Sequence, residues 1–264
     1  MTIPHITNKQ KGIPKLLFRF RYLHSLYIQK FLNHKGKRRI NSWLKNLTEK
    51  HYIEKMPKKN TFEERTKPSI YFVGINGIRF LKTLDDYSPN VIRKLYKDGT
   101  HEKPFISKCL LIADICIHLK KVSRKNELYS SVTNREYASP DSPYHFLEEN
   151  GLKPDLVVTK EKVKRKTYYL LTVFEETLPR YIVRKRIRSY IDFYFSSEWE
   201  ENKSKKFPII LFIFPTKADL IYAKRFTRKL MEENQNPKDL HIRFAQAFDV
   251  REFGITSEIW EEVK

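Results

Sequence analysis

The sequence is short of cysteine. Among 264 residues there are only two, Cys109 and Cys116, and both lie in one apolar run. Their separation of seven residues puts both thiols on the same face of a helix, and no group of Cys and His has the spacing of zinc ligands. We therefore expect buried, reduced thiols of the kind found in cytosolic proteins, and no zinc site.

Long apolar runs are also missing. The first residues are polar and basic, without the apolar segment of a signal peptide. The longest apolar runs are far shorter than the roughly 20 residues that a membrane helix needs. We expect a soluble intracellular protein with no membrane partner.

Acidic residues are scarce relative to basic ones. The chain has 31 Asp and Glu against 52 Lys and Arg, a formal net charge of +21. Residues 1–60 hold fifteen Lys or Arg and two acidic residues. Such a surplus indicates a polyanionic partner, and nucleic acid comes before an anionic membrane surface. The hydrophobic content of 40% is enough for packed cores in one large or two small domains.

The most informative stretch runs from Lys37 to Lys59. Ile40, Leu44 and Leu47 recur at helical spacing and form one apolar stripe. Basic and small polar side chains occupy the other face, as in a helix that enters the major groove of DNA. The alternative is a solvated basic helix on any small domain. The expected DNA-contacting residues are Lys37, Arg38, Arg39, Ser42, Lys45 and Asn46.

The order of elements around this helix is that of a winged helix. We expect loose residues over 1–13, a helix from Pro14, another over 25–32, a turn at Gly36 and the basic helix. Strands over 52–56 and 69–74 then form a hairpin, and a further helix covers 74–86. In such domains the third helix enters the major groove and the hairpin lies against the backbone. The expected phosphate contacts of the hairpin loop are Lys58, Lys59, Arg65 and Lys67; a flexible charged loop is the alternative.

The rest of the chain predicts a second domain. Residues 1–86 form the winged-helix domain, 87–121 are expected to be a linker with a connecting helix, and 122–264 form an α/β domain. In that last part, strands up to about residue 174 are followed by helix, strand, helix and strand. This succession predicts three layers with a mixed sheet, so the chain is α/β in class, or α+β as a whole.

A metal site is only half present. Pro154-Asp155 heads a strand, and a second carboxylate on the neighbouring strand would complete a site for a hard divalent cation. The strand-interior positions there carry Thr172 and Phe174, so the sequence assigns no catalytic residue and no metal ligand. If the site is active, Asp155 and Glu175 hold Mg²⁺ and Lys185 or Arg184 assists. Asp155 as a strand-start residue is the alternative.

The chain resembles the replication-relaxation proteins of bacterial plasmids and other mobile elements. The resemblance rests on LLFRFRYLHSLYIQKFL, KRRINSWLKNLTEKHYI with PSIYFVGINGIRFL, and KPDLVV, TYYLLTVFEETLP and RKRIRSYIDFY in that order. It implies a winged-helix DNA-binding domain followed by a domain similar to PD-(D/E)XK nucleases, acting in replication or conjugative mobilisation. The family often has an acid pair where Thr172 and Phe174 stand here, and this departure argues against catalysis.

Three functions follow as hypotheses. The first is a DNA-binding accessory protein of a mobile element, bacterial and located at the nucleoid or plasmid, with double-stranded DNA as partner. Replication or mobilisation proteins and a second copy of the chain are further expected partners, and no cofactor is expected. The second is a metal-dependent endonuclease or nickase using Mg²⁺, and the third is a transcription repressor. The expected backbone contacts of the second domain are Lys162, Lys164, Arg165, Lys166, Arg184 and Arg188.

Overall fold

The structure, a computed structural model, describes residues 3–58, 61–84, 87–163, 165–203 and 205–263. The chain divides into two compact units. The first comprises Met1–Ile117 with Ala138–Pro140, and the second comprises His118–Tyr137 with Asp141–Lys264. In the part of the chain that is described, no helix is long and apolar enough to cross a membrane.

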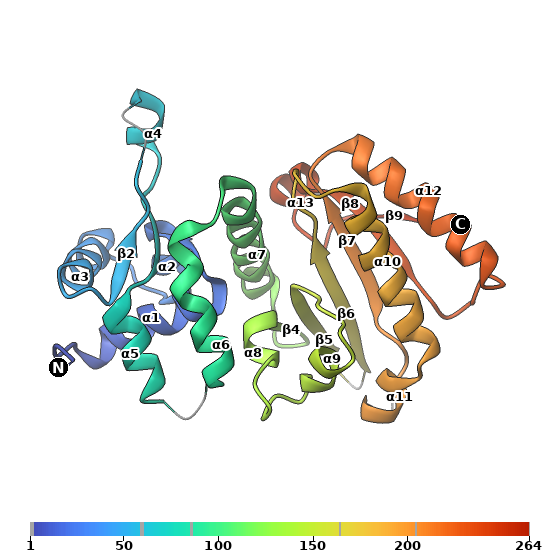
Figure 1. Ribbon diagram of the computed structural model, residues 1–264, viewed down its shortest axis with the longest axis horizontal. Helices are drawn as coiled ribbons and strands as arrows, with labels where there is room; N and C mark the ends of the chain where they lie inside the picture. Colours follow the sequence, from blue (N-terminus) through green and yellow to red (C-terminus); the bar gives the residue numbers. More distant parts are fainter. Residues whose placement is uncertain (1–2, 59–60, 85–86, 164, 204, 264) are drawn as a thin grey trace. The chain divides into compact units, whose positions relative to one another are not determined.

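The first unit combines helices with a small antiparallel sheet of three strands in the order β1-β3-β2. The hairpin β2–β3 carries the short helix α4 at its tip (Figure 1). This order agrees with the expected one, with α4 and the two-residue strand β1 added. The elements are α1 (Asn8–Phe20), β1 (Leu23–His24), α2 (Ser25–Phe31), α3 (Lys37–Glu49), β2 (Ile53–Lys55), α4 (Phe62–Thr66), β3 (Ile70–Val73) and α5 (Ile75–Lys82).

Helix α1 begins earlier than the sequence predicts. Thr7 and Gln10 form a capping box, in which Thr7 Oγ1 accepts from the Gln10 N–H and the Gln10 side chain accepts from the Thr7 N–H at 3.0 Å. Two orphan amide groups are thereby satisfied, so the helix starts at Asn8 and not at Pro14. Pro14 lies inside the helix, and residues 8–13, which we expected to be loose, are helical.

Residues 87–104 are part of the first unit's core and not a linker. They contain α6 (Pro89–Arg93) and the 3-10 helix η1 (Lys94–Thr100), whose apolar side chains Val91, Ile92 and Leu95 are buried. The fully buried Asp98 accepts from Arg21 Nε at 3.0 Å. The division between units lies inside α7 (Lys103–Val122), after Ile117, and not at residue 86.

The second unit is built on a mixed sheet of six strands in the order β4-β5-β6-β7-β8-β9. β6, β7 and β8 are parallel and the other pairs are antiparallel. β7 is an interior strand, as its unbroken apolar sequence predicts. The elements are β4 (Glu127–Thr133), α8 (Asn134–Tyr137), α9 (His145–Glu149), β5 (Leu156–Lys162), β6 (Arg165–Val173), α10 (Arg180–Phe195), α11 (Glu198–Lys203), β7 (Ile209–Phe214), α12 (Lys217–Glu233), β8 (Ile242–Gln246), α13 (Ala247–Phe253) and β9 (Glu261–Glu262).

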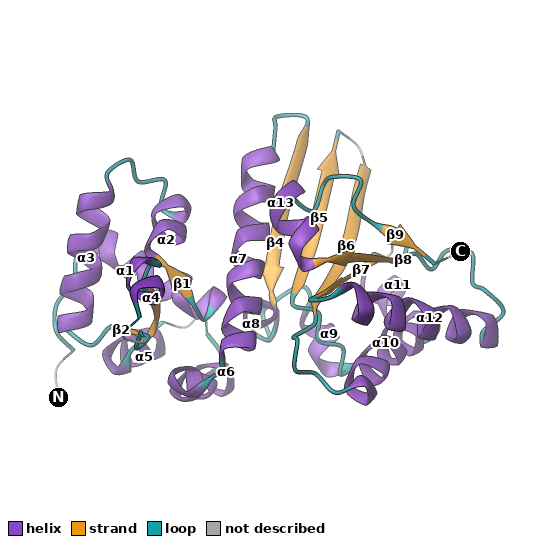
Figure 2. Ribbon diagram, turned by 90° about the horizontal axis from the view of Figure 1, so that it is seen from above, coloured by secondary structure: helices purple, strands orange, loops and turns teal. Residues whose placement is uncertain are grey.

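Helices cover this sheet on both faces, which confirms the mixed α/β class. α10 and α12 lie side by side on one face, and α13 lies on the other (Figure 2). The main core forms under α10 and α12, where Leu170, Phe212 and Phe244 of adjacent strands meet Ile187 and Leu220 of the helices. Because side chains alternate along a strand, the neighbouring residues of β5 to β8 face the side of α13.

Candidate nucleic-acid interface

Helix α3 presents a basic face to solvent. Lys37, Arg38, Arg39 and Ser42 are exposed, and none of their side chains forms a hydrogen bond or ion pair with another described residue. Lys45 is exposed as well and pairs with Glu49 at 3.9 Å between Nζ and Oε1. Four of the six expected contact residues on this helix are therefore unengaged within the described part of the chain.

The opposite face of α3 holds the helix in the unit. Ile40, Leu44 and Leu47 are buried, as their spacing predicts. Asn46 belongs to this inner side rather than to the basic face, because its side-chain oxygen accepts from Gln10 Nε2 of α1 at 3.1 Å. Its amide therefore orients α3 against α1.

The amino-terminal end of α3 is open. Its N-cap is Gly36, which has no side chain to accept from the first free amide groups, and no acidic residue lies in the first turn. His34 stays beside this end, with its ring 5.3 Å from the Trp43 ring. Free N–H groups at a helix N-terminus attract phosphate, and Lys37 to Arg39 add three positive charges at the same place.

The β2–β3 loop contributes a second set of basic side chains. Arg65 and Lys67 are exposed. Lys58 Nζ donates to the backbone carbonyls of Arg65, at 3.4 Å, and of Lys67, so this ammonium ties the two arms of the loop together. Lys59 lies outside the described residues.

One exposed aromatic residue in this loop was not predicted from the sequence. Phe62 begins α4 and is 83% exposed. The signal was present, because Phe62 is the single apolar residue in the segment PKKNTFEERTKP apart from its prolines. An exposed aromatic ring in a loop that also carries basic side chains is a feature of proteins that contact bases as well as phosphates.

Helix α10 of the second unit carries another basic stripe. Arg184 and Arg188 are exposed one turn apart, without an ion pair to another described residue. Tyr181, which the sequence reading did not include, lies three residues before Arg184 and is 62% exposed. Arg180 lies over the Tyr222 ring of α12, 4.6 Å from its centroid. Of the β5–β6 turn, Lys162, Arg165 and Lys166 are exposed, while Lys164 is outside the described residues.

At the incomplete metal site around Asp155, the polar groups are bonded to other groups of the protein. Asp155 is 4% exposed, and its Oδ2 accepts from the Val173 backbone N–H at 2.8 Å. At the positions where a second carboxylate would stand, Thr172 Oγ1 is 2.5 Å from the Tyr190 hydroxyl, and Phe174 stacks on Phe214. Burial raises the pKa of Tyr190, so its hydroxyl stays protonated.

Glu175 and Lys185, the other residues predicted for the metal site, do not complete it. Glu175 follows the end of β6 and is half-buried, whereas Lys185 of α10 is exposed. Among the residues that the structure describes, no three His, Cys, Asp or Glu side chains come together in a group that could hold a metal ion.

Comparisons with known proteins return no relative. No family model, no curated protein and no solved structure matches the chain. The candidate contact surfaces are the basic face of α3 and the β2–β3 loop in the first unit, and the stripe on α10 in the second.

Proposed function

We propose that this protein binds double-stranded DNA through its first unit, which acts as a winged helix. α3 enters the major groove, and the β2–β3 loop lies against the phosphate backbone. The observation that carries this proposal is the exposed, unengaged set Lys37, Arg38, Arg39 and Ser42 on a helix whose other face is buried.

The two kinds of contact have different roles. Arg38, Arg39 and Ser42 are of the types that read base edges, and arginine does so through paired hydrogen bonds to guanine. Lys37, Arg65 and Lys67, with the open N-terminus of α3, supply phosphate contacts that position the helix without reading sequence. Phosphate contacts supply most of the affinity and make it depend strongly on salt.

In this proposal the second unit adds backbone affinity, and a DNA-binding role is favoured over a nuclease activity. Arg184 and Arg188 of α10 are free for phosphate contacts, and Tyr181 on the same stripe offers a ring for stacking. The geometry around Asp155 favours a structural role, because its carboxylate bonds to backbone and Thr172 and Phe174 point into packed surroundings. Hydrolysis of DNA is accordingly the less favoured function.

On the basis of the resemblance to replication-relaxation proteins, we propose that this DNA binding serves a plasmid or other mobile element. We propose an accessory role in replication, mobilisation or their control. A repressor built on the same winged helix is distinguished by where it binds, since a repressor occupies its own promoter and an accessory protein occupies a replication or transfer origin.

The test measures affinity for duplex DNA with the full chain. A 30-bp duplex selected from a random library and an unselected 30-bp duplex, both fluorescein-labelled, are titrated by anisotropy at several salt concentrations. Arg38→Ala and Arg39→Ala are each expected to cost about 1–3 kcal/mol on the selected duplex and less on the unselected one. Arg65→Ala is expected to lower the affinity for both duplexes equally. It is also expected to reduce the slope of log affinity against log salt concentration by about one.

A matched control removes the same charge elsewhere in the unit. Lys94 and Lys97 are exposed on η1, so the pair Lys94→Ala/Lys97→Ala is compared with Arg38→Ala/Arg39→Ala. Equal losses in the two double variants would show that net charge, and not α3, determines binding.

A further inference from the structure

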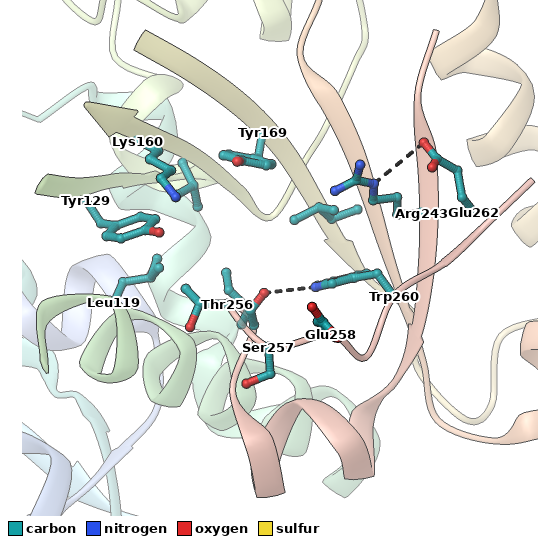
Figure 3. A pocket seen from close by; sticks show the side chains of 13 residues that line it. Leu119, Tyr129, Lys160, Tyr169, Arg243, Thr256, Ser257, Glu258, Trp260 and Glu262 are labelled. Carbon is teal, nitrogen blue, oxygen red and sulfur yellow. Dashed lines mark hydrogen bonds and ion pairs between the residues drawn. The ribbon is translucent and has the colours of Figure 1, made fainter. Parts of the chain in front are cut away.

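A cavity of about 410 Å³ lies in the second unit (Figure 3). Tyr169 and Leu211, which line it, alternate with Leu170 and Phe212 of the core under α10 and α12, so the cavity lies on the other side of the sheet. Its floor comes from Val158 of β5, Tyr169 of β6 and Leu211 of β7. The strand register sets Val158 directly opposite Tyr169, and Leu211 directly opposite Arg243. Cavities of about 300–1,000 Å³ hold small molecules in other proteins.

Aromatic side chains form the walls above this floor. Trp260 comes from the chain after α13, and its indole Nε1 donates to the Ile255 carbonyl at 2.9 Å, which fixes the ring. Tyr129 of β4 closes another side. Flat walls over an apolar floor accommodate a planar, largely apolar molecule best.

The bend that brings this wall over the floor is built around a glycine. Gly254 ends α13 with φ of +80°, and a Cβ there would fall 2.1 Å from the His118 ring. His118 Nε2 in turn lies 3.0 Å from Thr256 Oγ1. The wall is thus held at both the Gly254 and the Trp260 ends, so the cavity is a preformed feature of the unit.

One cation at the cavity has hydrogen-bonding capacity to spare. The Arg243 side chain forms no hydrogen bond with another described residue, and its ion pair with Glu262 is loose, with 3.6 Å between Nε and Oε1. A guanidinium has five donors in a planar fork that matches a carboxylate. Figure 3 shows this group at one end of the cavity.

The second cation is already engaged. Lys160 Nζ lies 2.8 Å from Glu127 Oε1 and 5.4 Å from the centre of the Tyr129 ring. Glu127 also accepts from the Tyr129 hydroxyl at 2.7 Å. Lys160 is therefore neutralised where it stands, whereas the looser ion pair of Arg243 with Glu262 leaves the terminal nitrogens of the guanidinium for a ligand.

We propose that this cavity is a binding site for a planar aromatic monocarboxylate, whose ring lies on Val158, Tyr169 and Leu211 and whose carboxylate pairs with the Arg243 guanidinium. The site is independent of DNA binding, because none of its residues belongs to α3, the β2–β3 loop or the stripe on α10.

The test is calorimetric titration of the full chain with naphthalene-2-carboxylate and with naphthalene-2-carboxamide, which has the same ring and no charge. We expect saturable one-to-one binding of the carboxylate and binding of the carboxamide weaker by about tenfold or more. Arg243→Lys keeps the charge but removes the planar fork of the guanidinium. This variant is expected to bind the carboxylate more weakly by a similar factor and to bind the carboxamide with unchanged affinity.

Two further variants complete the test. Trp260→Leu removes the flat wall and is expected to bind both compounds more weakly. Circular dichroism shows whether each variant is folded. Arg184→Lys on α10 makes the same substitution on the other side of the sheet and is expected to change neither affinity. Absence of saturable binding, equal affinity for the two compounds, or an equal loss in Arg184→Lys and Arg243→Lys would overturn the proposal.

Discussion

The carboxylate of Asp155 accepts a hydrogen bond from the backbone N–H of Val173, with 2.8 Å between Oδ2 and N. Asp155 directly precedes β5, and Val173 is the last residue of the adjacent strand β6. A residue that heads a strand in the manner of a nuclease ligand thus satisfies a buried amide group of its own sheet.

Loss of this hydrogen bond is expected to destabilise the fold. Asp155→Ala leaves the Val173 N–H without its acceptor and is expected to lower the free energy of unfolding by about 1–3 kcal/mol, measured by urea denaturation. Asp155→Asn retains an acceptor oxygen and is expected to lose less. Nuclease activity is tested by incubating the natural chain and Asp155→Asn with supercoiled plasmid and Mg²⁺ or Mn²⁺. Cleavage by the natural chain that is lost in Asp155→Asn would restore the nuclease hypothesis.

The buried pair of Arg21 and Asp98 is expected to be among the most sensitive sites of the first unit. Arg21 Nε donates to Asp98 Oδ1 at 3.0 Å, and the Asp98 side chain is fully buried. Asp98→Ala leaves a guanidinium without its partner, so we expect a loss of about 3–5 kcal/mol in thermal or urea unfolding. Glu54→Ala removes an exposed partner of His51 and serves as control, with a loss under about 1 kcal/mol. Similar losses in both variants would contradict the assignment.

Gly77 is expected to tolerate no larger residue. A Cβ at this position would lie 2.2 Å from the Tyr52 carbonyl oxygen, so α5 could not remain so close to the chain before β2. Gly77→Ala is expected to lower the midpoint of thermal unfolding, at a cost of about 1–3 kcal/mol. In Gly36→Ala the new Cβ meets its nearest neighbour, the His34 ring, at 3.5 Å, and we expect a cost of a few tenths of a kcal/mol. An unchanged midpoint in Gly77→Ala would show that α5 shifts freely.

His24 makes the first unit sensitive to mild acid. Its Nδ1 accepts from the Tyr27 N–H at 3.3 Å and caps α2, a role that needs the neutral ring. Burial, and secondarily the charge of Lys30, lower the pKa of His24 below its ordinary value. The unfolded chain therefore binds the proton more tightly, and this contribution to stability is present above about pH 6.5 and is lost as the pH falls through the lower folded-state pKa.

The substitution His24→Asn isolates this effect. Asparagine is a good N-cap residue that does not titrate, so the variant is expected to lose less stability than the natural chain between neutral pH and mild acid. Urea unfolding at a series of pH values measures both chains. Parallel profiles would show that the remaining histidines, and not His24, determine the acid sensitivity.

Local patterns in the sequence determined much of what the structure contains. The apolar stripe of Ile40, Leu44 and Leu47 identified α3 and its buried face, because helical periodicity is a property of neighbouring residues. The unbroken run of β7 identified an interior strand for the same kind of reason. The basic surplus predicts a polyanionic partner, and the DNA titrations test that prediction.

Tertiary structure decided what distant residues do to one another. Asn46 carries a side chain suited to base contacts, yet its amide is bonded to Gln10, which lies 36 positions away. Residues 87–104 look like a linker by composition, but Val91, Ile92 and Leu95 pack and Asp98 meets Arg21 across 77 positions. The cavity beside Arg243 is assembled from strands and a returning segment that share no local pattern. Periodicity reports which side of an element is buried, whereas a partner far along the chain is fixed only when the elements pack.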